Sequence, residues 1–266
     1  MNRILCCLLL LSLALPAAAQ APVERTSDYD LVLIHGLGGN ATIWEDTIPL
    51  LKLVFNVWTF ELPGHGTTPP IADATIETVS QELEDYIAEH GIRRPTLVGH
   101  GMGGLVALRY AFDRPDAVNR VALIDCAPKQ LATDEQKAAV ADQLVRNYDR
   151  FVAGYYLNMS PREEVNQKAV DMALRTDQVT FQQLLLSSFD FDVTEELKQQ
   201  SIPILLIGSA MLFPDPAHAR RAMELMGFGD ARAITYKTMP EVGHYMMIEQ
   251  PGYLASTIIA FAGLKN

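Results

Sequence analysis

The regular alternation of short apolar runs with longer amphipathic stretches constrains the fold of this chain more than any other feature. Six runs predict strands, at residues 29–34, 55–60, 96–98, 121–124, 204–207 and 233–239. Helical periodicity lies between them, at residues 43–53, 76–90, 105–112, 216–226 and 253–262. The central runs are apolar throughout, which is typical of strands that are buried on both faces. Because strands that alternate with helices are joined by crossovers, we predict an α/β fold with a mostly parallel sheet of about six strands.

One interval, residues 128–201, interrupts this alternation because it contains no convincing strand. Residues 134–156 and 179–189 have helical periodicity, and a third helix is expected to begin with Ser160 as N-cap, Pro161 at the first position and Glu163 at the third. Ligands of open α/β sheets bind at the carboxyl ends of the strands. We therefore expect residues 128–201 to form a helical cap there, over a core made of residues 20–127 and 202–266.

The first nineteen residues have the pattern of a secretory signal. Arg3 precedes an apolar run at residues 4–15, Pro16 ends the run, and Ala17–Ala19 supply small residues for cleavage before Gln20. The run is too short for a membrane-spanning helix, which needs about 20 residues. We therefore expect a secreted or periplasmic protein with no stable membrane anchor after cleavage.

The composition narrows the range of partners. The chain of 266 residues has 32 acidic residues against 21 Lys and Arg, a formal net charge of -11. This acid excess argues against a nucleic-acid surface, which needs clustered basic residues. No spacing typical of a zinc site occurs, so we predict neither a metal nor a cofactor. The expected partner is a small-molecule substrate, and the sequence leaves the oligomeric state open.

A glycine-rich turn is the strongest chemical motif. The segment GHGMGG at 99–104 follows one predicted strand and precedes a predicted helix, which is the setting of a nucleophile elbow. Three further motifs follow other strands: HGLGG at 35–39, ELPGHG at 61–66, and VGH at 242–244. Parallel strands present their carboxyl ends at one edge of a sheet, so we expect these motifs to meet in one site.

On these four motifs, in this order, the chain resembles the α/β-hydrolase superfamily over residues 29–264. The resemblance implies an α/β-hydrolase fold that carries a nucleophile at position 101 and a catalytic base at His244. It also implies an oxyanion hole built from the backbone N–H groups of Leu37 and Met102. We interpret His35 and His100 as hydrogen-bonding groups that support this site.

The sequence departs from the family at the nucleophile, because Gly101 stands where the G-x-S-x-G pattern has Ser. Glycine relieves the strain of the elbow, which costs a non-glycine residue roughly 1–3 kcal/mol. The turn is therefore expected to persist while the acyl-enzyme route is lost, through either a natural or an introduced replacement.

The catalytic acid has two candidates, because Met211 occupies the usual place in the family pattern. Asp125 follows the strand at 121–124, an arrangement similar to that of haloalkane dehalogenases and cofactor-free dioxygenases. Its carboxylate could accept the Nδ1–H of His244 and fix the tautomer of the ring. Asp215 is the alternative acid, although its place between two prolines also suits the start of a helix.

Three functions remain open from the sequence. The first is hydrolysis of a small ester-like substrate, with water in place of the missing serine. The second is general-base chemistry by a His244–Asp125 dyad without any acyl-enzyme. The third is a ligand-binding relative that has lost catalysis. The fold alone does not choose among them, because function depends on the site.

Overall fold

The computed structural model describes residues 29–129 and 132–263. Six strands form one parallel sheet in the order β2-β1-β3-β4-β5-β6. The strands are β1 (Asp30–Ile34), β2 (Asn56–Phe60), β3 (Thr96–His100), β4 (Arg120–Ile124), β5 (Ile204–Ser209) and β6 (Ile234–Met239). The predicted α/β fold and its parallel sheet of six strands are confirmed. The expected signal segment, residues 1–19, lies outside the described residues.

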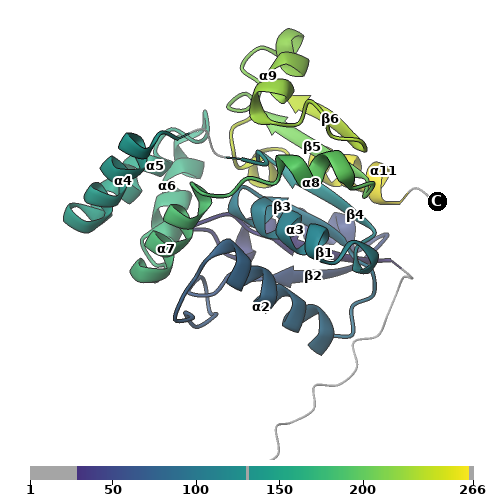
Figure 1. Ribbon diagram of the computed structural model, residues 1–266, viewed down its shortest axis with the longest axis horizontal. Coiled ribbons are helices and arrows are strands. Elements are labelled where there is room, and N and C mark those ends of the chain that lie inside the picture. The colour runs from purple at the N-terminus through teal and green to yellow at the C-terminus, as the bar shows by residue number, and fades with distance from the viewer. Residues whose placement is uncertain (1–28, 130–131, 264–266) are drawn as a thin grey trace, which may run out of the picture.

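Burial follows the order of the strands. Every residue of β1, β3, β4 and β5 is buried, whereas most residues of the edge strand β6 are partly or fully exposed. Helices cover both faces of the sheet: α2 (Ile76–Glu89) and α3 (Met102–Asp113) lie in front of it in Figure 1, and α11 (Pro251–Ala262) lies behind. The continuous apolar runs of the central strands are explained by this double cover.

Five helices occur between β4 and β5: α4 (Asp134–Arg146), α5 (Tyr148–Tyr156), α6 (Glu163–Ala173), α7 (Gln178–Ser188) and α8 (Thr194–Gln199). The first four form a group beside the sheet, whereas α8 lies along α3 (Figure 1). Arg109 of α3 contacts Glu196 of α8 at 3.4 Å. We call α4–α7 and their connections the cap.

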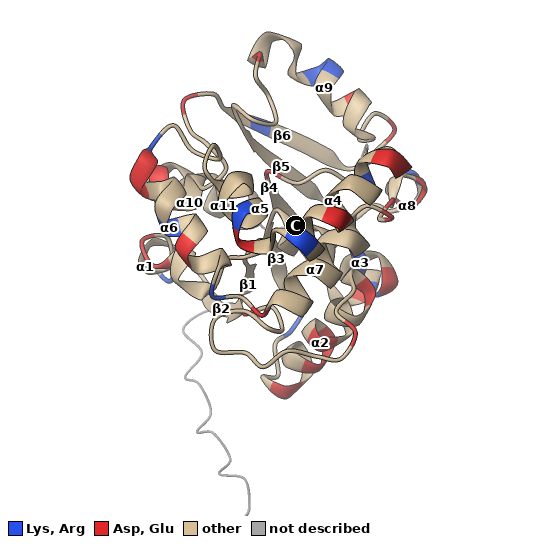
Figure 2. Ribbon diagram, turned by 90° about the vertical axis from the view of Figure 1, so that its left-hand side faces the viewer, with Lys and Arg blue, Asp and Glu red and all other residues tan. Residues whose placement is uncertain are grey.

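The remaining elements are short. They are η1 (Ala41–Trp44), α1 (Ile48–Leu51), η2 (Pro115–Ala117), η3 (Pro216–His218), α9 (Ala219–Met226) and α10 (Met246–Glu249). No helix within the described ranges has the length and apolarity to cross a membrane. On the face shown in Figure 2, acidic residues are spread over the surface helices and no continuous band of Lys and Arg crosses it.

Several predicted helix boundaries were wrong. The stretch at 43–53 is interrupted, because Pro49 fits only the first turn of α1. The stretch at 134–156 is broken at Asn147, whose φ of -144° and ψ of 47° are not helical. Ser160 is not an N-cap: α6 begins at Glu163, and the Ser160 hydroxyl accepts the N–H of Arg162 in the preceding turn.

Candidate active site

The turn between β3 and α3 has the conformation expected of a nucleophile elbow. Gly101 has φ 50° and ψ -115°, and its N–H donates to the carbonyl of Ile124 at 2.9 Å. Residues with a side chain rarely adopt this positive φ. At Gly103 a Cβ would lie 2.4 Å from the carbonyl oxygen of Ile34, so glycine lets α3 approach β1. The backbone of the elbow is present although its nucleophile is missing.

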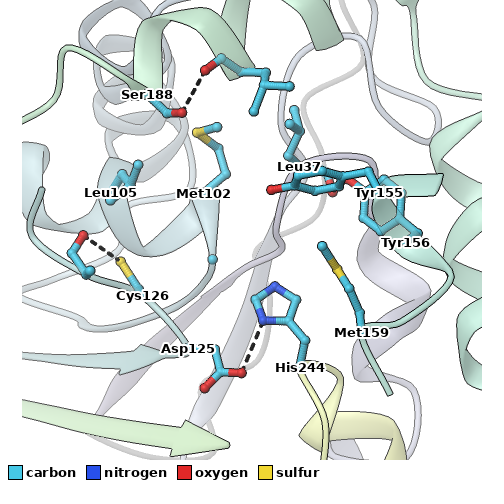
Figure 3. A pocket seen from close by; sticks show the side chains of 13 residues that line it. Leu37, Met102, Leu105, Asp125, Cys126, Tyr155, Tyr156, Met159, Ser188 and His244 are labelled. Atoms are coloured by element: carbon cyan, nitrogen blue, oxygen red, sulfur yellow. Dashed lines mark hydrogen bonds and ion pairs between the residues drawn. The ribbon is translucent and has the colours of Figure 1, made fainter. Parts of the chain in front are cut away.

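His244 points into the pocket shown in Figure 3, and Gly101 lines the same pocket. A Cβ built on Gly101 would lie 3.3 Å from Nε2 and 3.5 Å from Cε1 of His244, and 3.9 Å from Cα of Gly36. The distance places Nε2 within reach of any hydroxyl or water at that position. The segment that follows β6 therefore brings its imidazole to the elbow.

Asp125, which directly follows β4, lies behind the imidazole. Its Oδ2 is 3.1 Å from Nδ1 of His244, and its side chain is almost fully buried. The carboxylate also accepts two hydrogen bonds from Ser209, one from the backbone N–H at 2.6 Å and one from the hydroxyl at 2.5 Å. An Nδ1–H donated to Asp125 leaves the lone pair of Nε2 facing position 101, which is the tautomer that a general base needs.

The structure places the alternative acid elsewhere. Asp215 caps η3 by accepting the N–H of Ala217, and its other oxygen lies 2.7 Å from Nδ1 of His218 on the surface. These hydrogen bonds, that from His218 first, lower the pKa of Asp215 below its ordinary value. Met211 is half exposed. Of the two candidates, Asp125 is the one that contacts His244.

The backbone of His244 is held on both sides. Its N–H donates to the carbonyl of Met159 in the cap at 2.6 Å, and its carbonyl lies 3.0 Å from Nε2 of His100. The ring of His100 packs against that of His244 with 4.2 Å between centroids. Burial lowers the pKa of His100, so the ring is neutral and its Nε2–H is the donor to the carbonyl.

The loop at residues 35–39, which the sequence predicts to form part of the oxyanion hole, is bound to the loop at 61–66 by two buried histidines. The N–H of Leu62 donates to Nε2 of His35, and the N–H of Gly38 donates to Nε2 of His65, each at 3.0 Å. Burial lowers the pKa of His35 to about 4 and that of His65 to about 3, so both rings are neutral acceptors. Within the described residues, the N–H groups of Leu37 and Met102 have no hydrogen-bond acceptor.

A cavity of about 140 Å³ lies between these groups and the cap. The cap contributes Tyr155, Tyr156 and Met159 to the wall of this cavity. Among the described residues that line it, the ionisable side chains other than tyrosine and cysteine are Asp125 and His244. Cys126 also lines it, and burial raises the pKa of its thiol, which is therefore protonated at neutral pH. A cavity of similar size in another protein holds benzene, so this volume admits a small molecule.

Sequence reasoning missed Ser209, although it had one usable signal, because it is a polar residue at the carboxyl end of the strand next to Asp125. Tyr156 and Met159 belong to a group of aromatic and methionine residues that the sequence predicts to be mostly helix-packing core, with a few lining the pocket from the cap. Their hydrogen bonds to the core were not predicted, since only the docking of the cap creates them. Among the described residues, no group of three or more His, Cys, Asp or Glu side chains could hold a metal ion.

Comparison with known proteins agrees with the fold described above. A sequence model of the "Alpha/beta hydrolase family" matches residues 31–257. A pimeloyl-[acyl-carrier protein] methyl ester esterase of Vibrio cholerae is 30% identical over 190 residues, which are 66% of this chain and 73% of the relative. The enol-lactonase of Burkholderia xenovorans superimposes with a TM-score of 0.78 at 20% identity, over 91% of this chain and 94% of its own. An esterase of Thermogutta terrifontis gives 0.76 at 23% identity, over 88% and 89%.

Proposed function

This chain belongs to the alpha/beta hydrolase family, and on that premise we propose that it hydrolyses small, uncharged esters with water as the nucleophile. One observation carries the proposal: Gly101 and His244 line the same cavity, a Cβ at residue 101 would lie 3.3 Å from Nε2 of His244, and Nδ1 of the same ring contacts Asp125. A water molecule can occupy this cavity without forming a covalent bond to the protein.

The proposed reaction has two steps. Nε2 of His244 removes a proton from the water, whose oxygen attacks the carbonyl carbon of the ester, and the carbonyl oxygen becomes an oxyanion that binds the amides of Leu37 and Met102. The tetrahedral intermediate then breaks its bond to the alcohol oxygen, which receives the proton from Nε2. Asp125 stabilises the imidazolium that exists between the steps.

The substrate class follows from the cavity. Its volume of about 140 Å³ admits few heavy atoms, and no Lys or Arg side chain lines it to bind an anionic group. An ester is favoured over other carbonyl compounds because the relative from Vibrio cholerae is a methyl ester esterase. A short acyl group on a small alcohol therefore fits the site best.

The test is hydrolysis of p-nitrophenyl acetate by the parent chain and by His244→Ala. A protein that keeps its oxyanion hole without its nucleophile retains about 10³–10⁴-fold over water in the best-studied case. We expect His244→Ala to lower the rate at least about tenfold, because it removes the general base. The parent should show no burst of nitrophenol, because no acyl-enzyme accumulates.

His218→Ala is the matched control. His218 also has an aspartate at its Nδ1, at 2.7 Å, but lies exposed on the surface away from the elbow. Its removal should leave the rate unchanged. Equal rates in the parent, His244→Ala and His218→Ala would show that the dyad does not activate water and would leave a binding function for the cavity.

A further inference from the structure

A single turn of the cap, residues 156–160, contacts both halves of the active site. The hydroxyl of Tyr156 donates to the carbonyl of Leu37 at 2.6 Å in the loop at residues 35–39. Three residues later, the carbonyl of Met159 accepts the N–H of His244 at 2.6 Å. The cap therefore does more than wall the cavity, because its hydrogen bonds fix loops that belong to the core.

Two hydrogen bonds tie this turn to α6 of the cap, and close packing places it against the core. The side chain of Asn166 in α6, which is buried, accepts the N–H of Ser160 at 2.8 Å and donates to its carbonyl at 2.9 Å. At Gly243 a Cβ would lie 2.3 Å from the carbonyl oxygen of Met159. Glycine at position 243 therefore allows the turn to pack closely beside His244.

The hydroxyl of Tyr156 binds one peptide unit of the loop at residues 35–39. The peptide between Leu37 and Gly38 has its carbonyl bound to the hydroxyl of Tyr156 and its N–H bound to Nε2 of His65. A trans peptide is planar, so hydrogen bonds at both polar ends fix its plane. The N–H of Leu37 belongs to the adjoining peptide, whose carbonyl, that of Gly36, accepts the N–H of Gly39 at 3.0 Å. The Tyr156 contact therefore acts on the peptide that is covalently next to the one carrying the Leu37 N–H.

We propose that Tyr156 is a positioning residue through which the closed cap holds the Leu37 amide in the orientation that stabilises the oxyanion. This role rests on the proposed hydrolysis. Tyr156 is fully buried and donates its proton to a carbonyl, so it has no proton to offer a substrate while the contact lasts. The site is therefore complete only when the turn at 156–160 is docked.

The test uses Tyr156→Phe, which removes the hydroxyl and keeps the ring. Turnover of p-nitrophenyl acetate is measured in a chain that also carries Gly101→Ser, so that the rates are large. We expect kcat to fall about tenfold, since a buried carbonyl loses its donor, while KM changes by less than twofold because the cavity wall is conserved. The same variant, without Gly101→Ser, should exchange the Gly38 amide hydrogen about tenfold faster.

Tyr148→Phe is the matched control. Tyr148 also lies in α5, and its buried hydroxyl has no hydrogen-bond partner among the described residues. Its loss should change neither kcat nor the exchange of Gly38. Equal kcat values for Tyr156→Phe and Tyr148→Phe, or a loss confined to KM, would overturn the role of Tyr156.

Amide exchange separates this proposal from the proposed function. If the parent and His244→Ala hydrolyse the ester equally fast, the hydrolytic function is refuted, and the exchange of the Gly38 amide still reports on the contact between Tyr156 and the loop at residues 35–39. Faster exchange in Tyr156→Phe than in Tyr148→Phe would support the positioning of the loop by the cap. Unchanged exchange would refute it, whatever the activity. A denaturant melt of each variant verifies that it is folded.

Discussion

Replacing Gly101 with serine tests whether this site retains the geometry of a covalent hydrolase. A Cβ at position 101 would lie 3.3 Å from Nε2 of His244. The hydroxyl oxygen of a serine is bonded to Cβ, so rotation about the Cα–Cβ bond brings this oxygen within hydrogen-bond reach of Nε2. The Ser would then be activated by His244 and attack the ester carbon, forming an acyl-enzyme.

Gly101→Ser should lower the stability of the protein and raise its activity. At φ 50° and ψ -115° a side chain adds strain of about 1–3 kcal/mol to the free energy of the folded state. For a domain of this size, each kcal/mol lowers Tm by roughly 2–4 °C. In the best-studied serine protease, loss of the nucleophile costs about 10⁶ in kcat. We expect a partial recovery, with kcat for p-nitrophenyl acetate rising at least about 10²-fold.

Gly101→Ala is the control, because it adds the same Cβ and the same strain without a hydroxyl. Melting curves should show both variants destabilised to a similar extent, and stopped-flow absorbance should show a nitrophenol burst for the serine variant alone. If Gly101→Ser melts as a folded protein and is as inactive as Gly101→Ala, the elbow and His244 do not form a dormant triad and the reasoning is refuted.

Two further predictions concern the groups around the dyad. Because burial lowers the pKa of His65 to about 3 and of His35 to about 4, the unfolded chain binds more protons than the native state below pH 6.5. The free energy of unfolding should therefore fall between pH 6.5 and 4, by about 1.4 kcal/mol per pH unit for each ring, and His65→Gln should reduce this slope in urea melts. Ser209→Ala removes one hydrogen-bond donor to Asp125 and should lower the free energy of unfolding by about 1–3 kcal/mol. Ser256→Ala is its control and should lower the free energy of unfolding far less, because the Ser256 hydroxyl is exposed on α11. Equal losses of stability in the two variants would contradict the contact between Ser209 and Asp125.

The sequence predicted the fold well because the strongest signals are local. The run at 204–207 is apolar throughout, and the structure has it as part of β5 between β4 and β6. Because the carboxyl ends of parallel strands lie at one edge of the sheet, the sequence alone predicts that Gly101, Asp125 and His244 lie close together. Chain order and strand direction alone carried that inference.

The parts that were not predicted depend on contacts between distant segments. The Leu37 carbonyl meets Tyr156 across 119 positions of sequence, and Asp125 meets Ser209 across 84. Neither contact leaves a periodic pattern, because each involves one side chain. Local errors had local causes: Pro49 and Asn147 interrupt helices whose apolar periodicity continues across the break. Periodicity reports which face is buried and gives little information on where the backbone turns.

The spacing between Tyr156 and Met159 limits how this protein can diverge. The turn at 156–160 has two anchoring atoms, the hydroxyl of Tyr156 and the carbonyl oxygen of Met159, which reach separate loops of the core. An insertion or deletion between them would release one anchor while the other stayed bound, whereas changes in α4 leave both in place. We therefore expect this protein to tolerate changes in α4, whereas a change in the turn at 156–160 requires matching changes in the loops that it contacts.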